Sequence, residues 1–419
     1  MHLNSRVIVF LSLCVSINPV SAQQAGSSWE ADPAQVAKDS ARNPQFNYEE
    51  SKVPTFTLPD PLKMADGRSV SSKQDWINGR RDELVEVFRR EVYGRRPTTE
   101  YHVDFQVLAE TDDVFEGKAT GRDMQAIVTI GEREFKFPFT VFIPNAVTEP
   151  GPVIVFINNR RPDTVQSVIE EEASTGAKRT IIDRGYAIAT FHTSDVDPDR
   201  KDGYADGIRA FFANGQPLQN DDWGGLSAWG WAASRVLDYM VAQPEIDSSR
   251  TAVGGHSRSG KTALWAAAED PRFSIAYSND SGCGGAAISR RRFGETVGRI
   301  TSVFPHWFCE NFTAYSERED QLPVDQHELL ALIAPRAVYV ASADLDLWAD
   351  PKGEYASVVA AAPVYQLLGE EVITDPEMPP LNTPRHIGKT GYHIRSGAHM
   401  ISETDWKMFL DFAAGQWSR

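Results

Sequence analysis

Short apolar runs separated by segments with helical periodicity recur through the middle of the chain. Residues 152–157 (PVIVFI) form a continuous apolar run that is typical of a strand covered on both faces. Similar runs follow at 186–190, 251–254, 274–278 and 337–341. Helical stretches such as 228–242 and 261–269 lie between them. This alternation predicts a mainly parallel sheet with helices on both faces, and a ligand site at the carboxyl ends of its strands.

The part of the chain before this alternation has a different pattern. Residues 72–93 space their apolar side chains as a helix with one buried face would. Residues 103–143 change to alternating strands, which predicts an antiparallel flank to the sheet. Residues 23–61 are polar and contain proline with little periodicity, so we expect an extended N-terminal arm. Residues 62–419 are then expected to form one α/β domain.

The first residues have the features of an export signal. Arg6 supplies a positive charge, residues 7–15 (VIVFLSLCV) are apolar, and residues 20–22 (VSA) are small enough for signal peptidase. We predict a cleaved signal peptide over residues 1–22 and a secreted or periplasmic protein. Lipidation of Cys14 is the lesser alternative, because the preceding residue is a leucine.

Composition and charge exclude several classes of protein. The chain is 41% hydrophobic and 24% charged, which excludes a disordered or fibrous protein. Its 42 basic and 58 acidic residues give a net charge of −16, which would repel nucleic acid. Beyond the export signal no apolar run approaches the roughly 20 residues that span a bilayer. We expect a monomer with no nucleic-acid or membrane partner.

The cysteines leave one alternative open. Removal of the signal peptide leaves Cys283 and Cys309, which in an oxidising compartment form either one disulfide or two separate buried thiols. No CxxC or HExxH pattern is present, so neither a structural zinc site nor a zinc protease is supported. We expect no metal and no cofactor.

The strongest chemical signal lies between a predicted strand and a predicted helix. Residues 255–261 (GHSRSGK) place Ser257 at the apex of a tight turn, with the N-terminus of the next helix behind it. Such an elbow exposes a serine hydroxyl as a nucleophile. The usual glycine two residues after the serine is replaced by Ser259, with Gly260 following, so an ordinary glycine-rich turn is the alternative.

A nucleophilic serine needs a histidine base and a carboxylate that orients it. In folds with this elbow the chain order is serine, acid, histidine, which favours a histidine after the last strand. His399 lies in a loop of small residues ahead of a helix, and it is our candidate base. Asp280 and Asp346 both follow strand ends, and either could accept the imidazole proton. Asp346 follows the later strand and is favoured.

These motifs carry a family resemblance. The segments 255–261 (GHSRSGK), 279–287 (NDSGCGGAA), 304–308 (FPHWF) and 348–351 (WADP) resemble the bacterial glucuronoyl esterases of carbohydrate esterase family 15. The resemblance spans most of the mature chain and implies an α/β-hydrolase fold for the domain at 62–419. Many family members have glutamate where this chain has Asp280, which further favours Asp346 as the acid.

The resemblance also implies roles for individual residues. Ser257 would be the nucleophile, His399 the base and Arg258 an oxyanion stabiliser. Contacts to the uronoyl sugar are implied for Lys261, Glu310 and Trp348. Physical reasoning supports two of these roles. Arg258 adjoins the nucleophile and offers several N–H donors. A lysine in the first helical turn opposes the helix dipole, so a compensating acceptor is expected there.

The predicted activity is that of a serine esterase without metal or cofactor. It would hydrolyse glucuronoyl or 4-O-methyl-glucuronoyl esters that join glucuronoxylan to lignin alcohols, through an acyl-enzyme. One alternative is another carbohydrate esterase, such as an acetyl xylan esterase. A second is a catalytically silent glycan-binding protein on a hydrolase scaffold.

Overall fold

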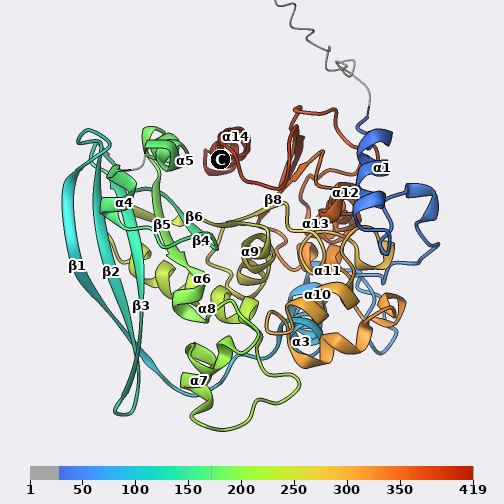
Figure 1. Cartoon of the computed structure of the whole chain (residues 1–419), viewed down its shortest axis with the longest axis horizontal. Coiled ribbons are helices and arrows are strands. Elements are labelled where there is room, and N and C mark those ends of the chain that lie inside the picture. Colours follow the sequence, from blue (N-terminus) through green and yellow to red (C-terminus); the bar gives the residue numbers. More distant parts are fainter. Residues whose placement is uncertain (1–27, 147, 171, 419) are drawn as a thin grey trace, which may run out of the picture.

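A single ten-stranded sheet forms the centre of the computed structural model, which describes residues 28–146, 148–170 and 172–418 (Figure 1). The predicted signal peptide at 1–22 lies outside the described residues. The strands are β1 (His102–Val114), β2 (Ala119–Ile130), β3 (Arg133–Pro144), β4 (Gly151–Asn158), β5 (Ala187–His192), β6 (Ile246–His256), β7 (Ile275–Asn279), β8 (Ala337–Ala343), β9 (Arg385–Ile387) and β10 (Thr390–Arg395). Their order across the sheet is β1-β2-β3-β5-β4-β6-β7-β8-β10-β9.

The centre of the sheet is parallel and its two edges are antiparallel. Strands β5, β4, β6, β7, β8 and β10 pair in parallel, whereas β1, β2, β3 and β9 pair antiparallel. The long hairpins of β1 to β3 stand at one side of Figure 1. Successive residues of β6 face opposite layers, because Val253 belongs to the larger hydrophobic core and Ala252 to the smaller one. The predicted fold class is therefore confirmed.

Helices cover both faces of the sheet. On one face α5 (Glu172–Asp183) and α14 (Glu403–Trp417) pack on the strands, and on the other face lie α8 (Gly225–Val241), α9 (Arg258–Glu269) and α12 (Pro351–Ala360). The remaining α-helices are α1 (Pro33–Arg42), α2 (Lys73–Asp75), α3 (Arg81–Phe88), α4 (Val165–Glu170), α6 (Thr193–Val196), α7 (Ile208–Ala213), α10 (Val297–Val303), α11 (Gln326–Ala331) and α13 (Ala362–Leu368). No helix in the described ranges combines the length and the hydropathy needed to cross a membrane.

One local expectation needs correction, one helix is confirmed and one strand was missed. The arm expected to be extended over 23–61 contains helix α1, which Asp32 caps by accepting a hydrogen bond from the N–H of Ala34. The helix expected over 72–93 is confirmed, because α2, a π-helical turn at Trp76–Arg80, α3 and a π-helical turn at Arg89–Tyr93 follow one another without a break up to Gly94. Strand β10 was not predicted, because its sequence TGYHIR lacks an apolar run although all six residues are buried.

Candidate active site

Four parallel strands bring the predicted chemistry to one edge of the sheet. Strands β6, β7, β8 and β10 are neighbours in that order, so their carboxyl ends lie side by side. Ser257 and Asp280 directly follow β6 and β7, and Asp346 and His399 lie in the loops after β8 and β10. Residues 142 positions apart in the chain therefore meet at this edge.

The turn between β6 and α9 is a strained elbow. Ser257 has φ 60° and ψ −126°, a conformation that L-residues seldom adopt without support from the fold. Gly255 allows the chain to return close to itself, because a Cβ there would lie 2.3 Å from the backbone oxygen of Ser259. Ser259, which occupies the usual glycine position of such an elbow, is fully buried behind the turn. The glycine that allows the close approach is Gly255, which precedes Ser257.

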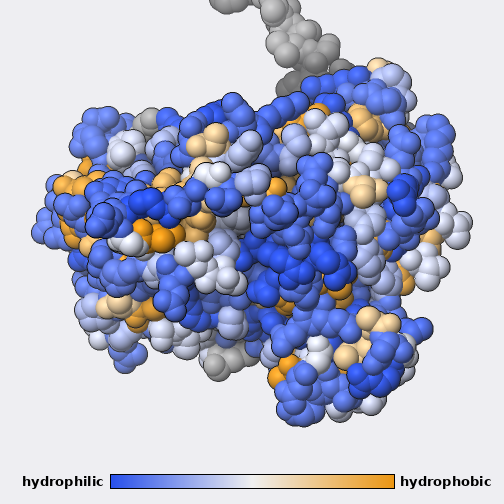
Figure 2. All heavy atoms as spheres, turned by 90° about the horizontal axis from the view of Figure 1, so that it is seen from below, coloured by the Kyte–Doolittle hydropathy of each residue, from blue (hydrophilic) through white to orange (hydrophobic). Residues whose placement is uncertain are grey.

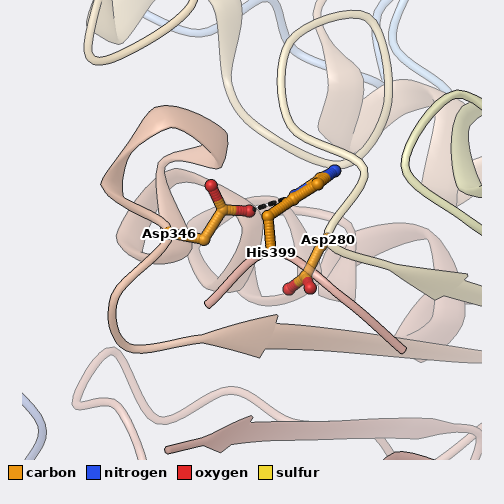
Figure 3. Close-up of side chains that lie close together, drawn as sticks. All are labelled: Asp280, Asp346 and His399. Atoms are coloured by element: carbon orange, nitrogen blue, oxygen red, sulfur yellow. Dashed lines mark hydrogen bonds and ion pairs between the residues drawn. The ribbon is translucent and has the colours of Figure 1, made fainter. Parts of the chain in front are cut away.

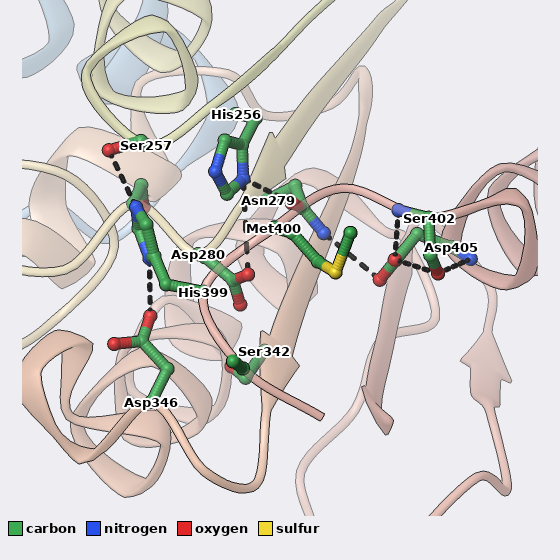
Figure 4. A network of polar contacts seen from close by, with 12 residues as sticks. His256, Ser257, Asn279, Asp280, Ser342, Asp346, His399, Met400, Ser402 and Asp405 are labelled. Carbon is green, nitrogen blue, oxygen red and sulfur yellow. Dashed lines mark hydrogen bonds and ion pairs between the residues drawn. The ribbon is translucent and has the colours of Figure 1, made fainter. Parts of the chain in front are cut away.

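Ser257, His399 and Asp346 form a continuous hydrogen-bonded chain (Figure 4). The Oγ atom of Ser257 lies 2.9 Å from Nε2 of His399. Nδ1 of His399 lies 2.6 Å from Oδ2 of Asp346, which is 5% exposed. In this arrangement Nδ1 donates to the carboxylate and Nε2 is left to accept the serine proton.

Asp280 lies close to this chain but outside it (Figure 3). It is buried and has a positive φ of 46°, and one of its oxygens lies 3.4 Å from Nη2 of Arg395. Its other oxygen has no hydrogen-bond partner among the described residues. Burial raises the pKa of Asp280 well above its usual value, and the Asp346 carboxylate raises it further. Asp346 is therefore the carboxylate that is hydrogen-bonded to His399.

Arg395 holds the loop that carries His399. Its guanidinium is buried and donates one hydrogen bond of 3.0 Å to the carbonyl of Ala398 and another to the carbonyl of Met400. On its other side Nε lies 2.6 Å from Oδ2 of Asp405 in α14. The loop is therefore anchored to the folded core on both sides of His399.

Ser257 opens into a cavity of about 340 Å³, which we call the nucleophile cavity. It is lined by side chains from four of the loops at this edge of the sheet and from the segment after α10. Its lining includes Arg258, Lys261, Glu295, Phe304, Trp307, Asp346, Trp348 and His399. Two cations and several polar groups therefore surround the serine.

A partly buried carboxylate that was not singled out in the sequence holds Arg258. Asp199, in the loop after α6, forms an ion pair with the Arg258 guanidinium. It also accepts hydrogen bonds of 2.8 Å from Nε2 of His306 and 2.7 Å from Nε1 of Trp307. The guanidinium lies 4.6 Å from the centre of the Trp307 ring. Although burial opposes the charged form, hydrogen bonds and the Arg258 cation lower the pKa of Asp199 to about 2.

Lys261 is buried in the first turn of α9, and protein oxygens compensate its charge. Its ammonium group donates to the carbonyls of Ser281 and Cys283, the latter at 2.7 Å, and lies 3.9 Å from Oε2 of Glu295. The acceptors expected for a lysine at this position of the helix are thus mainly the two backbone carbonyls and the Glu295 carboxylate. Burial raises the pKa of Glu295, while the Lys261 cation and a hydrogen bond from Trp348 oppose the rise.

The structure brings Trp348 to the nucleophile cavity but not Glu310, although the family resemblance implied a sugar contact for both. Trp348 lines the nucleophile cavity, with its indole in edge-to-face contact with Phe46 at 4.9 Å. Glu310 does not reach this cavity. It is exposed and lines a neighbouring cavity beside α7, whereas Glu295 is the carboxylate that stands next to Lys261. Glu310 begins the 3-10 helix Glu310–Tyr315, and no pattern in the sequence indicates which cavity its side chain lines.

The disulfide considered for Cys283 and Cys309 is wrong. Both are free, buried thiols. Cys309 packs beside the end of the 89–93 turn, where its Sγ lies 3.6 Å from the carbonyl of Arg90. Cys283 lies in the loop after β7, where its carbonyl accepts from Lys261.

One group of side chains has the spacing to hold a metal ion within the described ranges. Ligand atoms of Asp280, Asp346 and His399 lie within 4.8 Å of one another (Figure 3). Both nitrogens of His399 already face Asp346 and Ser257, so a cation here would compete with the hydrogen-bonded chain.

Sequence reasoning missed Asp199, Glu295 and Arg395. Asp199 follows β5 in a segment with three aspartates (SDVDPD), and the sequence has no feature that distinguishes them. Arg395 ends a strand that was not predicted. The sequence indicates a site residue mainly by its place directly after a predicted strand. Ser257, Asp280 and Asp346 could be identified in this way because the strands before them are apolar enough to be predicted.

Comparison with known proteins places the chain in a family. A family profile described as "Glucuronyl esterase, fungi" matches residues 127–369, more than half of the chain. Carbohydrate esterase MZ0003, from an unknown prokaryotic organism, is 37% identical over 418 residues, covering 92% of this chain and 94% of the relative. A 4-O-methyl-glucuronoyl methylesterase of Schizophyllum commune is 28% identical, covering 74% of each chain. The solved structure of a glucuronoyl esterase from Solibacter usitatus is 36% identical with a TM-score of 0.80, covering 88% of this chain and all of the other. The chain belongs to the glucuronoyl esterase family, carbohydrate esterase family 15.

Proposed function

We propose that this protein is a serine esterase that hydrolyses glucuronoyl esters of glucuronoxylan, including 4-O-methyl-glucuronoyl esters, with lignin-type alcohols as leaving groups. The observation that carries the proposal is the chain from Ser257 through His399 to Asp346, which ends in a polar cavity. Family membership and the names of the relatives support the uronoyl substrate.

In the proposed reaction Ser257 attacks the ester carbonyl while Nε2 of His399 takes the hydroxyl proton. His399 then gives that proton to the leaving alcohol, which leaves an acyl-enzyme. Water attacks the acyl-enzyme with His399 again as the base, releasing the uronic acid and restoring the serine. Asp346 keeps the imidazole in the required tautomer and stabilises its charged form. The raised pKa of Asp280 argues against it as the acid.

The oxyanion has two sources of donors in this geometry. Arg258 is the first residue of α9, where a backbone N–H has no acceptor within the helix. The Arg258 side chain, fixed by Asp199 and Trp307, adds a cation in the same cavity. A donor at such a position typically lowers the barrier by about 2.7 to 4 kcal/mol.

Three side chains are proposed to recognise the sugar. Lys261 and Glu295 form a buried polar pair that offers both a donor and an acceptor to ring hydroxyls. Trp348 offers an aromatic surface to the sugar ring. We also propose that the protein is exported after removal of residues 1–22 and acts as a monomer.

The test is hydrolysis of benzyl glucuronate and para-nitrophenyl acetate by the wild type and Ser257→Ala. We expect turnover of the glucuronate that is lost in the variant. Ser259→Ala is the matched control, because its hydroxyl lies in the same turn and has no partner among the described residues. Turnover of the acetate alone would reject the uronoyl substrate and favour another carbohydrate esterase. Turnover of neither ester would favour a silent glycan-binding protein.

A further inference from the structure

A second, larger cavity lies beside the nucleophile cavity and has no part in the proposed chemistry. It has a volume of about 910 Å³ and lies beside α7, the helix at the lower edge of Figure 1. We call it the α7 cavity and define it by Lys201, Tyr204, Gln216, Gln219, Trp223 and Glu310. The face seen in Figure 2, which includes the underside of this region, is mostly hydrophilic with scattered hydrophobic side chains.

One short segment forms part of the wall of both cavities. Phe304 and Trp307 line the nucleophile cavity, whereas Pro305, His306 and Phe308 line the α7 cavity. The two cavities are therefore neighbours along this segment.

The α7 cavity is built by backbone contacts that fix its shape. The N–H groups of Gly225 and Leu226 donate to the carbonyls of His306 and Trp307, at 2.7 and 3.0 Å. The N–H of Asn311 donates to the carbonyl of Asn220 at 3.1 Å. The two sides of the cavity are thus joined to each other, which makes it a preformed site.

An exposed tyrosine is held in place inside this cavity. The side chain of Tyr204 is 46% exposed, and the buried guanidinium of Arg209 lies 5.8 Å from the centre of its ring. Arg209 is itself fixed, because its Nε lies 2.8 Å from Oδ2 of the buried Asp197. The exposed ring therefore stands next to an anchored cation and offers an aromatic face to a ligand.

The polar side chains of the cavity indicate the chemistry of its ligand. Lys201 and Glu310 have opposite charges, and neither has an ion-pair partner in the described part of the chain. Gln216 and Gln219 add exposed amides. Balanced charge does not favour a polyanion, and the amides and charges do not favour a wholly aromatic ligand. Neutral sugar residues, with hydroxyl edges and apolar faces, fit both the amides and the ring.

We propose that the α7 cavity binds neutral sugar residues of the polysaccharide that bears the uronoyl ester, with Tyr204 as the stacking surface. This inference rests on the proposed function in one respect, which is that the sugar residue bound at Ser257 is a uronoyl ester. The nucleophile cavity then selects the ester, and the α7 cavity selects the chain that carries it.

The first experiment measures binding of xylotetraose, which carries no ester, by titration calorimetry. We expect wild type and Tyr204→Phe to bind alike, and Tyr204→Ala to bind about tenfold more weakly because the stacking surface is lost. Leu108→Ala is the control, since Leu108 is an equally exposed side chain on β1 at the sheet edge. Absence of binding by wild type, or equal binding by Tyr204→Ala, would overturn the proposal whether or not the protein is an esterase.

The second experiment separates the sugar from the leaving alcohol. Benzyl esters of glucuronate and of glucuronate linked to xylotriose are compared in the wild type and Tyr204→Ala. We expect the variant to raise KM for the longer ester about tenfold with kcat unchanged, and to leave the glucuronate ester unaffected. If Tyr204→Ala instead raises KM for plain glucuronate esters, and more so for larger aryl alcohols, the cavity binds the alcohol and the proposal is overturned. Loss of all turnover in wild type with xylotetraose binding intact would reject the esterase alone.

Discussion

Replacing Asp199 by asparagine preserves the shape of the side chain and removes the charge that holds Arg258. Oδ1 of Asp199 accepts from His306 and Trp307, and Oδ2 faces Arg258. An asparagine that keeps its oxygen toward His306 and Trp307 turns its NH₂ group toward the guanidinium, where two donors meet. The variant should therefore release Arg258 from its anchor without removing any atom from the oxyanion site.

The size of the effect follows from the side-chain freedom that Arg258 regains. Ordering a free arginine costs up to about 2 kcal/mol of conformational entropy. At about 1.36 kcal/mol per factor of ten, kcat on benzyl glucuronate should fall roughly 10- to 30-fold. Arg258→Ala removes the donor itself and should cost about 10²- to 10³-fold. KM should change little in either variant, because the interaction is made mainly in the transition state.

A double-mutant comparison tests whether Asp199 acts through Arg258. In an Arg258→Ala background, Asp199→Asn should have almost no further effect on kcat. Asp195→Asn is the matched control, because Asp195 lies on the same segment, its side chain is 30% exposed, and its ion pair within the described residues is with His192 at 3.9 Å. The reasoning is refuted by an equal loss of kcat from Asp199→Asn in both backgrounds, or by no loss in the wild-type background.

The same substitution has a predicted effect on stability. The pKa of Asp199 is lowered to about 2 from 3.8, so its anion stabilises the fold above about pH 4 and this contribution is lost as the pH falls toward 2. At pH 7 the difference is about 2 kcal/mol at 1.36 kcal/mol per pKa unit. Urea titrations should show Asp199→Asn less stable at pH 7, with the gap narrowing between pH 4 and pH 2. An unchanged gap would contradict this assignment.

Three further predictions concern the elbow and the groups behind it. Asp346→Asn should lower kcat by about 10⁴-fold, because the imidazole loses its orienting carboxylate, whereas Asp280→Asn should lower it far less; the reverse order in steady-state assays would make Asp280 the acid. Gly255→Ala should abolish folding or activity, since its Cβ would lie 2.3 Å from a backbone oxygen; a soluble, active variant with a normal circular dichroism spectrum would refute this. Burial and the neighbouring His399 lower the pKa of His256 to about 3 in the folded protein. As the pH drops below 6.5 the imidazole is protonated in the unfolded chain but not in the folded one, so the free energy of unfolding falls. Between pH 7 and pH 5 this loss is about 2 kcal/mol, and urea titrations should show it diminished in His256→Gln but not in the exposed control His102→Gln.

The sequence alone was sufficient for those features that depend on local pattern. Apolar runs such as 152–157 and 337–341 predicted central strands, because a strand buried on both faces has no polar positions. The elbow at Ser257 was readable because a tight turn between strand and helix demands small residues. His399 was chosen by its place after the last strand, and the structure brings it 2.9 Å from Ser257.

Features that depend on which segments meet were not readable from the sequence. Strand β10 contains buried polar residues, and Asp405 of α14 supplies partners for His393 and Arg395. Glu295 rather than Glu310 lies beside Lys261, and the sequence around these two glutamates does not show which of them will contact the lysine.

Local order along the chain therefore determined the apolar central strands, the elbow and the candidate nucleophile and base. The tertiary structure alone decided the environment of each charge. It left Asp346 bonded to His399 while it buried Asp280 away from that bond, and it brought Asp199 to Arg258 from a distant loop. The physical reason is that burial and the distance between charges set their energies, and both are properties of the packed molecule rather than of the neighbouring sequence.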